Sequence, residues 1–154
     1  MQIRCLLPSV KYLMLGSKLL KIETPESWEA IYSPSVSMPE LDTIEKINSW
    51  VNSNIKYVGD EKDYWQNAKE TLDRKEGDCE DIAILKLKLL ENLGLEPSLL
   101  ICRDLVSRCA HAVVVIDGMI LDNFTSHVLS EKEYQGILSP IYVLKGREKF
   151  ICGS

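Results

Sequence analysis

The sequence predicts an α+β fold in one domain that spans residues 1–154. Between residues 41 and 94, apolar side chains recur at helical spacing. After Gly94, short runs of Val, Ile and Leu are separated by turn residues, a pattern that is typical of strands. Helices that come first and strands that follow favour an antiparallel sheet over a doubly wound parallel one. A chain of 154 residues is long enough to bury one core without disulfides.

Composition excludes several classes of protein. The formal net charge is -5 and no basic cluster occurs, which argues against nucleic-acid binding. No run approaches the roughly 18 apolar residues of a membrane span, so we expect no membrane partner. The five cysteines show no paired spacing, which favours reduced thiols. Because Pro8, Lys11 and Lys18 interrupt the first apolar run, no export signal is recognised, and we expect a cytoplasmic location.

The first half of the chain predicts a hairpin and then helices. Residues 11–22 suit a hairpin with Gly16 and Ser17 at its tip, and a helix over the same residues is the alternative. A short helix is expected from Pro25, followed by a loop. Residues 41–55 form an amphipathic helix capped by Asp42 or Thr43. Its apolar stripe contains Ile44, Ile47, Val51 and Ile55.

The rest of the chain predicts two more helices and then mostly strands. A polar turn leads to a helix over residues 64–76, and a longer helix follows between Gly77 and Gly94. The β-rich runs are residues 95–103, 110–117, 119–123 and 140–146, and residues 130–136 suggest a short helix between the last two.

The segment GDCED places a cysteine at the start of the long helix. At 100° per residue, an apolar arc surrounds Cys79 and contains Ile82, Ala83, Leu85, Leu87, Leu89, Leu90 and Leu93. The opposite arc contains Glu80, Asp81, Lys88, Glu91 and Asn92. Cys79 therefore points inward. Lys86 falls within the apolar arc and must either pair with a carboxylate or extend its stem to water.

The position of Cys79 has opposing effects on its thiol pKa. The first helical turn lowers this pKa, because unpaired N–H groups and the helix dipole stabilise an anion. The neighbouring carboxylates of Asp78 and Glu80 raise it unless they bind a cation. The competing interpretation is that Cys79 is a small buried apolar residue and that the acids only serve the helix terminus.

Two histidines are available as partners of the thiol, His111 and His127. Asp117-Gly118 predicts a two-residue hairpin turn, which makes His111 and Asp122 diagonal neighbours on one face of the sheet. A carboxylate there can orient the imidazole and support its positive charge. Asn123 points to the other face, and His127 is expected at the surface. The alternatives are a histidine that only bonds to its neighbours, or a zinc site from Cys102, Cys109 and His111.

The order of these residues resembles the transglutaminase-like branch of the papain-type fold. More narrowly, the segment from Trp50 to Gly94, with its GDCED motif, and the later HAVVVIDG and ILDN resemble the bacterial transglutaminase-like cysteine proteinases. The resemblance covers residues 41–123, and the family includes periplasmic enzymes that release surface adhesins. This chain is shorter, lacks an export signal and has Asn67-Ala68-Lys69-Glu70 where a proline often precedes the glutamate.

The resemblance implies a role for each matching residue. Cys79 would be the nucleophile, His111 the general base and acid, and Asp122 the residue that orients His111. Asp78 and Glu80 correspond to the acids that bind calcium in calcium-dependent members, although the chemistry itself requires no cofactor. The oxyanion would accept hydrogen bonds from the Cys79 backbone N–H and from a second donor, for which Trp65 and Gln66 are the candidates. A core position for Trp65 is the alternative.

These expectations describe a cysteine peptidase that hydrolyses a peptide or amide bond of a protein or peptide substrate through a thioester. Transglutaminase or amidase chemistry on the same three residues is one alternative, because the acceptor is chosen by the groove. A binding or regulatory module that has kept the fold and lost turnover is another.

Overall fold

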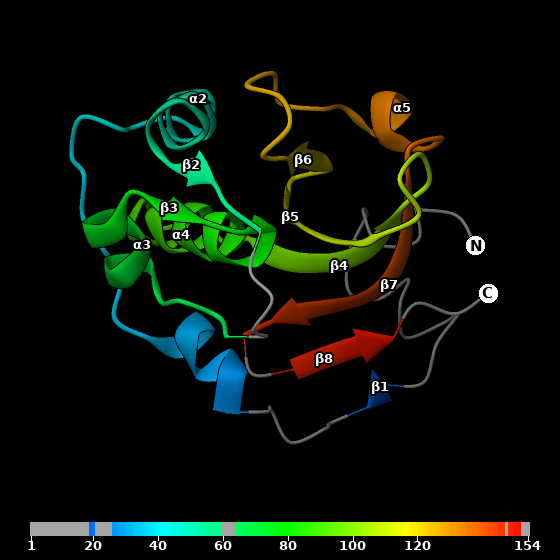
Figure 1. The fold of residues 1–154 in the computed structure, drawn as a ribbon, viewed down its shortest axis with the longest axis horizontal. Coiled ribbons are helices and arrows are strands. Elements are labelled where there is room, and N and C mark those ends of the chain that lie inside the picture. Colours follow the sequence, from blue (N-terminus) through cyan, green and yellow to red (C-terminus); the bar gives the residue numbers. More distant parts are fainter. Residues whose placement is uncertain (1–18, 21–25, 60–63, 147, 152–154) are drawn as a thin grey trace.

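The computed structural model describes residues 19–20, 26–59, 64–146 and 148–151. It confirms an α+β architecture in which helices cover a curved antiparallel sheet (Figure 1). Most of the hairpin expected over residues 11–22, including its tip at Gly16 and Ser17, lies outside the described residues; Leu19–Leu20 form a strand that pairs with residues 149–150. Among the helices that are described, none is long and apolar enough to cross a membrane.

The sheet has six strands in the order β1-β8-β7-β4-β5-β6, and every neighbouring pair is antiparallel. Its strands are β1 (Leu19–Leu20), β4 (Ser98–Asp104), β5 (Ala110–Ile116), β6 (Met119–Leu121), β7 (Leu138–Lys145) and β8 (Glu148–Ile151). Strand β8 was not expected from the sequence. Its four residues mix charged and apolar side chains, and pairing with β7 and β1 holds it in the sheet.

The β5–β6 hairpin forms in the predicted register. Ile116 faces Met119 across the turn. Asp117 and Gly118 have φ values of 48° and 77°. Two successive positive φ values are what a type I′ turn requires, and its twist suits the flanking strands. This turn decides which residues of the two strands lie opposite each other beyond it.

Three of the helices begin at side-chain caps. The described helices are the 3₁₀ helix η2 (Glu26–Tyr32) and the α-helices α2 (Ile44–Asn54), α3 (Ala68–Arg74), α4 (Cys79–Asn92) and α5 (Glu131–Tyr134). Thr43 caps α2, which settles the choice between Asp42 and Thr43. Helix α3 starts four residues later than predicted, because Asn67 caps it in a reciprocal box with Glu70. A small parallel pair, β2 (Lys56–Tyr57) and β3 (Glu76–Gly77), precedes α4.

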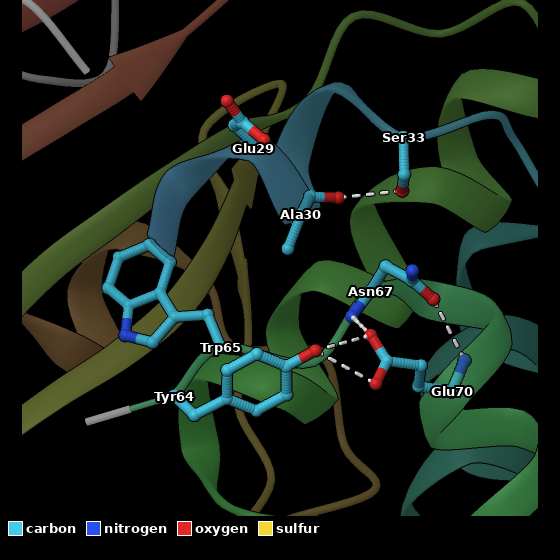
Figure 2. A pocket seen from close by; sticks show the side chains of 7 residues that line it. All are labelled: Glu29, Ala30, Ser33, Tyr64, Trp65, Asn67 and Glu70. Atoms are coloured by element: carbon cyan, nitrogen blue, oxygen red, sulfur yellow. Dashed lines mark hydrogen bonds between the residues drawn. The ribbon is translucent and has the colours of Figure 1, made fainter. Parts of the chain in front are cut away.

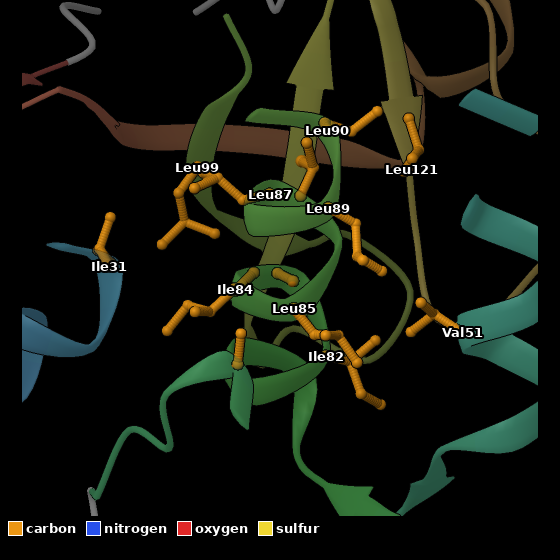
Figure 3. Close-up of a cluster of buried hydrophobic side chains, with 14 of the residues drawn as sticks. Ile31, Val51, Ile82, Ile84, Leu85, Leu87, Leu89, Leu90, Leu99 and Leu121 are labelled. Carbon is orange, nitrogen blue, oxygen red and sulfur yellow. The ribbon is translucent and has the colours of Figure 1, made fainter. Parts of the chain in front are cut away.

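Helix α4 lies at the centre of the main core, between η2, α2, α3 and strand β5 (Figures 1 and 3). The predicted polar arc is therefore only partly exposed. Asp81 is 2% exposed and Lys88 is 6% exposed, contrary to the expectation for that arc. Asp81 bonds to backbone amides and Lys88 pairs with Glu91 at 3.0 Å, so both buried charges have partners.

A second apolar cluster joins the sheet to α5. It contains Leu100, Cys102, Val113, Val115, Ile120, Tyr134, Leu138 and Val143. Residues of β5 alternate between the two clusters, since Ala112, Val114 and Ile116 belong to the main core. Strand β5 is thus buried on both faces, which fixes its register because a slip by one residue would exchange the side chains of the two clusters.

The central position of α4 predicts a large stability cost for Leu90→Ala. Leu90 is 0% exposed, so the substitution removes buried methyl groups and leaves a cavity. We expect the free energy of unfolding to fall by about 2–5 kcal/mol in urea denaturation. Leu93→Ala is the matched control at the C-cap of α4, because Leu93 is 36% exposed and its substitution should cost less than about 1 kcal/mol. Equal losses in the two variants would contradict the central placement of α4.

Candidate active site

The amino terminus of α4 is held by a pair of aspartates. Asp78 is the N-cap and accepts from the Asp81 backbone N–H at 3.1 Å. The Asp81 carboxylate in turn accepts from the backbone N–H groups of Asp78, at 3.0 Å, and of Gln66, at 2.8 Å. These bonds tie the segment before α3 to the first turn of α4. Cys79, the first residue of α4, is therefore held at a fixed terminus.

Asp81 was missed as a functional residue by the sequence analysis. A capping residue followed three positions later by an acid is a recognised signature of a helix start, and Asp78 with Asp81 fits it. The link from Asp81 to Gln66 has no local signal, because 15 residues separate them.

The thiol of Cys79 points inward, as predicted, and the residue is 8% exposed. Burial raises the pKa of Cys79 to about 12, and the Glu80 carboxylate adds to the rise. The backbone N–H of Ala112 donates to the sulfur and opposes the rise. At 3.5 Å the thiol itself donates to the Glu80 Oε2 atom. In the absence of a cation, the sulfur is thus held as a neutral thiol at physiological pH.

The carboxyl groups of Asp78 and Glu80 flank Cys79 and interact with each other, and Glu80 also accepts from its thiol. Burial raises the pKa of Glu80 to about 7, and the Asp78 carboxyl contributes to the rise. Two neighbouring carboxyl groups suit a hard cation. Among residues 26–59, 64–146 and 148–151, no group of three or more His, Cys, Asp or Glu side chains could hold a metal. The rest of a calcium shell would have to come from carbonyl oxygens and water.

His111 and Asp122 form the predicted side-chain pair. Their Nε2 and Oδ1 atoms are 2.8 Å apart, and each residue is 5% exposed. The same carboxylate oxygen accepts from the Phe124 backbone N–H at 3.2 Å. Burial alone would raise the pKa of Asp122, but the hydrogen bond and charge of His111 hold it below the usual value. Asp122 is therefore an ionised partner for the imidazole.

The sulfur and the imidazole belong to adjoining parts of the fold. The N–H that donates to Cys79 comes from Ala112, the residue directly after His111 in β5. Since Nε2 of His111 is engaged by Asp122, Nδ1 is the ring nitrogen left for proton exchange with another group.

Two exposed aromatic rings border the histidine. Phe124, 64% exposed, stacks on the His111 ring with centroids 5.0 Å apart and planes 17° apart. Tyr57 lies 6.2 Å from Phe124, between centroids, and is 50% exposed. Burial, followed by the charge of Cys79, raises the pKa of Tyr57. Phe124 thus covers one face of the imidazole, and Tyr57 lies next to Phe124.

Trp65 and Gln66 occupy buried positions before α3. The Gln66 side-chain amide donates to Thr71 Oγ1 at 3.2 Å and to the Glu76 carbonyl oxygen at 3.1 Å, which uses both of its hydrogens. This engagement counts against Gln66 as an oxyanion donor. Trp65 is 7% exposed within the main core, as the alternative interpretation required.

The Trp65 ring also lines a cavity of about 310 Å³ between η2 and α3 (Figure 2). The other lining residues are Glu29, Ala30, Ser33, Tyr64, Asn67 and Glu70. Tyr64 donates to the Glu70 carboxylate at 2.9 Å across it. Cys79, His111 and Asp122 do not line this cavity.

The structure also tests the expectations for His127 and for a zinc site. His127 is exposed, as predicted, and pairs with Glu133 at 3.0 Å. The zinc alternative is not supported, because the described residues contain no group of three or more side chains that could hold a metal. Cys102 is buried, and its thiol donates to the His111 carbonyl oxygen.

Both expectations for Lys86 are wrong. It neither pairs with a carboxylate side chain nor reaches water, since it is 0% exposed and donates to Asn48 Oδ1 and the Asp122 carbonyl oxygen.

Comparison with known proteins bears on the family and the fold. A family model described as the bacterial transglutaminase-like cysteine proteinase matches residues 24–137. The EGTA-treated structure of LapG from Legionella pneumophila is 25% identical, with a TM-score of 0.67 over 83% of this chain and 75% of that one. A calcium-bound LapG structure, also 25% identical, has a TM-score of 0.65 over 81% and 75%. No curated protein matches the chain. The expected transglutaminase-like fold is confirmed.

The aspartate pair at the helix start predicts that Gly77→Ala destabilises the protein. An added Cβ would lie 2.6 Å from the Asp81 Cβ and 3.1 Å from Gln66 Nε2, closer than packed atoms allow. We expect a loss of about 1–3 kcal/mol in the free energy of unfolding. Gly59→Ala is the control, because nothing lies within 4 Å of its added Cβ. A Gly77→Ala variant as stable as Gly59→Ala would refute the close approach.

Proposed function

The chain belongs to the bacterial transglutaminase-like cysteine proteinase family, and on that premise we propose that Cys79, His111 and Asp122 form its catalytic triad. The proposed reaction is hydrolysis of a peptide or amide bond in a protein or peptide substrate. The observation that carries the proposal is the buried 2.8 Å pair of His111 and Asp122. The next residue after His111 is Ala112, whose backbone N–H interacts with the Cys79 sulfur.

In the first half of the reaction, His111 Nδ1 accepts the thiol proton while the Cys79 sulfur attacks the substrate carbonyl carbon. Asp122 holds the ring through Nε2 and stabilises the imidazolium that forms. When the tetrahedral intermediate collapses, Nδ1 returns the proton to the leaving amine and a thioester remains on Cys79. In the second half, His111 takes a proton from water, which attacks the thioester, and the acid product leaves as the thiol is restored.

The negatively charged oxygen of each tetrahedral intermediate needs hydrogen-bond donors to stabilise it. The backbone N–H of Cys79 is the first, because it lies in the opening turn of α4, where N–H groups have no partner within the helix. Trp65 is retained as the candidate for the second donor. The occupied amide of Gln66 makes it the weaker candidate.

Calcium would be held by the carboxylates of Asp78 and Glu80. When bound, it would supply positive charge next to Cys79 and cancel the repulsion that these acids exert on a thiolate. LapG has been solved in a calcium-bound form, which supports the same ion for this chain. Glu80 would then release its hydrogen bond from the Cys79 thiol, and the backbone N–H of Ala112 would continue to stabilise the sulfur.

His111→Ala should abolish turnover and leave the fold intact. Without the imidazole, the thiol has no base and the leaving amine has no acid. Turnover is measured by mass spectrometry of a peptide library, and folding by circular dichroism. His127→Ala is the matched control, because this exposed histidine pairs with Glu133, away from the proposed triad, and should keep parental activity. Substantial residual turnover in His111→Ala would exclude it as the base.

The same library separates hydrolysis from acyl transfer. A primary amine such as biotinylated cadaverine is added, and the products are sorted into cleaved and amine-modified peptides. Cleavage alone supports a peptidase. Amine incorporation at glutamine without cleavage would instead identify the protein as a transglutaminase that uses the same thioester.

Calcium should increase the reactivity of Cys79 towards iodoacetamide at neutral pH. With the thiol pKa at about 12, alkylation in EGTA should be slower at Cys79 than at the exposed Cys109. Added calcium should reverse that order, as read by mass-spectrometric localisation. The paired substitutions Asp78→Asn and Glu80→Gln should remove the calcium response. If Cys79 reacts no faster than Cys109 with or without calcium, the enzyme proposal fails and a silent binding module is favoured.

A further inference from the structure

Lys86 is a fully buried amine that the mechanism above does not use. It lies on α4, seven residues after Cys79, and is 0% exposed. Its Nζ atom donates to Asn48 Oδ1 at 2.8 Å and to the backbone carbonyl oxygen of Asp122 at 3.1 Å. A single side chain thus connects the helix that begins with the thiol to the residue that pairs with the imidazole.

Two asparagines of α2 hold the same segment. Asn48, also 0% exposed, donates from Nδ2 to the carbonyl oxygens of Ser126, at 3.0 Å, and Thr125, at 3.3 Å. Asn52 donates to the carbonyl oxygens of Asp122, at 2.9 Å, and Thr125, at 2.7 Å. Residues 122–126 have left the β-ladder, since β6 ends at Leu121. Side chains from α2 and α4 therefore replace strand pairing for this segment.

An amine at this position is costly for folding. Burial lowers the pKa of Lys86 to about 7, and the charge of Asp122 opposes that change. An apolar side chain of similar length would avoid the cost, because the surrounding helix is packed in the main core. The bonds to Asn48 and Asp122 offset part of it, and they act on the residue that orients His111.

We propose that Lys86 is a positioning residue that fixes the backbone of Asp122 and balances its buried charge, so that the carboxylate stays in line with His111 Nε2. The catalytic part of this inference rests on the proposed triad. The structural part, that Lys86 controls the His111–Asp122 pair, does not. If Lys86 only filled space in the core, its substitution would change the stability of the protein but not the tautomer or the proton exchange of His111.

The test is nuclear magnetic resonance of protein labelled with ¹⁵N-histidine. The chain has two histidines, so His127, exposed and paired with Glu133, is an internal reference. In the parent protein we expect a single His111 tautomer, with a protected proton on Nε2. In Lys86→Met this proton should exchange with water at least about tenfold faster, and the two tautomers should mix, while His127 is unchanged.

The matched control is Lys88→Met, on the same helix. Lys88 is also buried, at 6% exposed, but its partner is Glu91 and not the Asp122 segment. It should leave the His111 signals as in the parent. Should Lys86→Met fail to fold, Lys86→Gln keeps a polar head without the charge or the reach, and the same acceleration is expected. Folded Lys86 variants with parental His111 signals would overturn the proposal.

Turnover is measured separately on the peptide library. If the triad is correct, Lys86→Met should lower kcat by about tenfold or more with little change in KM, whereas Lys88→Met should not. Parental kcat with disturbed His111 signals would disprove the triad and leave the positioning role of Lys86 standing. Parental signals with reduced kcat would disprove the positioning role and leave the triad standing.

Discussion

The structure depends on how the amino terminus of α4 is held inside the protein. A helix terminus leaves N–H groups without partners, and burying them is costly unless other groups bond to them. Here Asp78 and Asp81 satisfy one another's backbone, and Asp81 also binds the N–H of Gln66. The close approach at Gly77 completes this contact. Because of it, a cysteine can be the first residue of the helix and still face the core.

The same helix also stabilises the other half of the site. The turn at Asp117 and Gly118 sets the register that makes His111 and Asp122 neighbours, but the pair lies where the ladder ends. Lys86 of α4 and Asn52 of α2 hold the Asp122 carbonyl oxygen there. Helices α2 and α4 therefore hold the open end of the β5–β6 hairpin. The turn at Asp117 and Gly118 holds its tip.

Local rules were enough to predict part of this arrangement. The GDCED motif indicated a helix that starts at a cysteine, and the Asp117-Gly118 turn gave the pairing of His111 with Asp122 by counting residues. Long-range contacts could not be predicted in this way. The burial of Lys86 depends on Asn48, 38 residues earlier, and strand β8 is held by neighbouring strands rather than by its own pattern.

Some errors came from treating each helix in isolation. Helical periodicity assigned Asp81 and Lys88 to a solvent-facing arc, but other elements surround α4. Helix α3 was predicted to begin at residue 64, whereas the reciprocal Asn67 and Glu70 cap starts it at Ala68. That shift removes Trp65 and Gln66 from the helix and leaves them in the core beside its start.

The burial of Cys79 has a consequence for its oxidative chemistry. Peroxide attacks thiolates, and the route from sulfenic to sulfinic and sulfonic acid begins only where the thiolate is present and accessible. With 8% exposure and a pKa of about 12, the sulfur offers neither condition when no cation is bound. If Cys79 is the nucleophile and a cation binds beside it, as proposed above, the cation-free protein is protected from irreversible oxidation and the cation-loaded form is vulnerable.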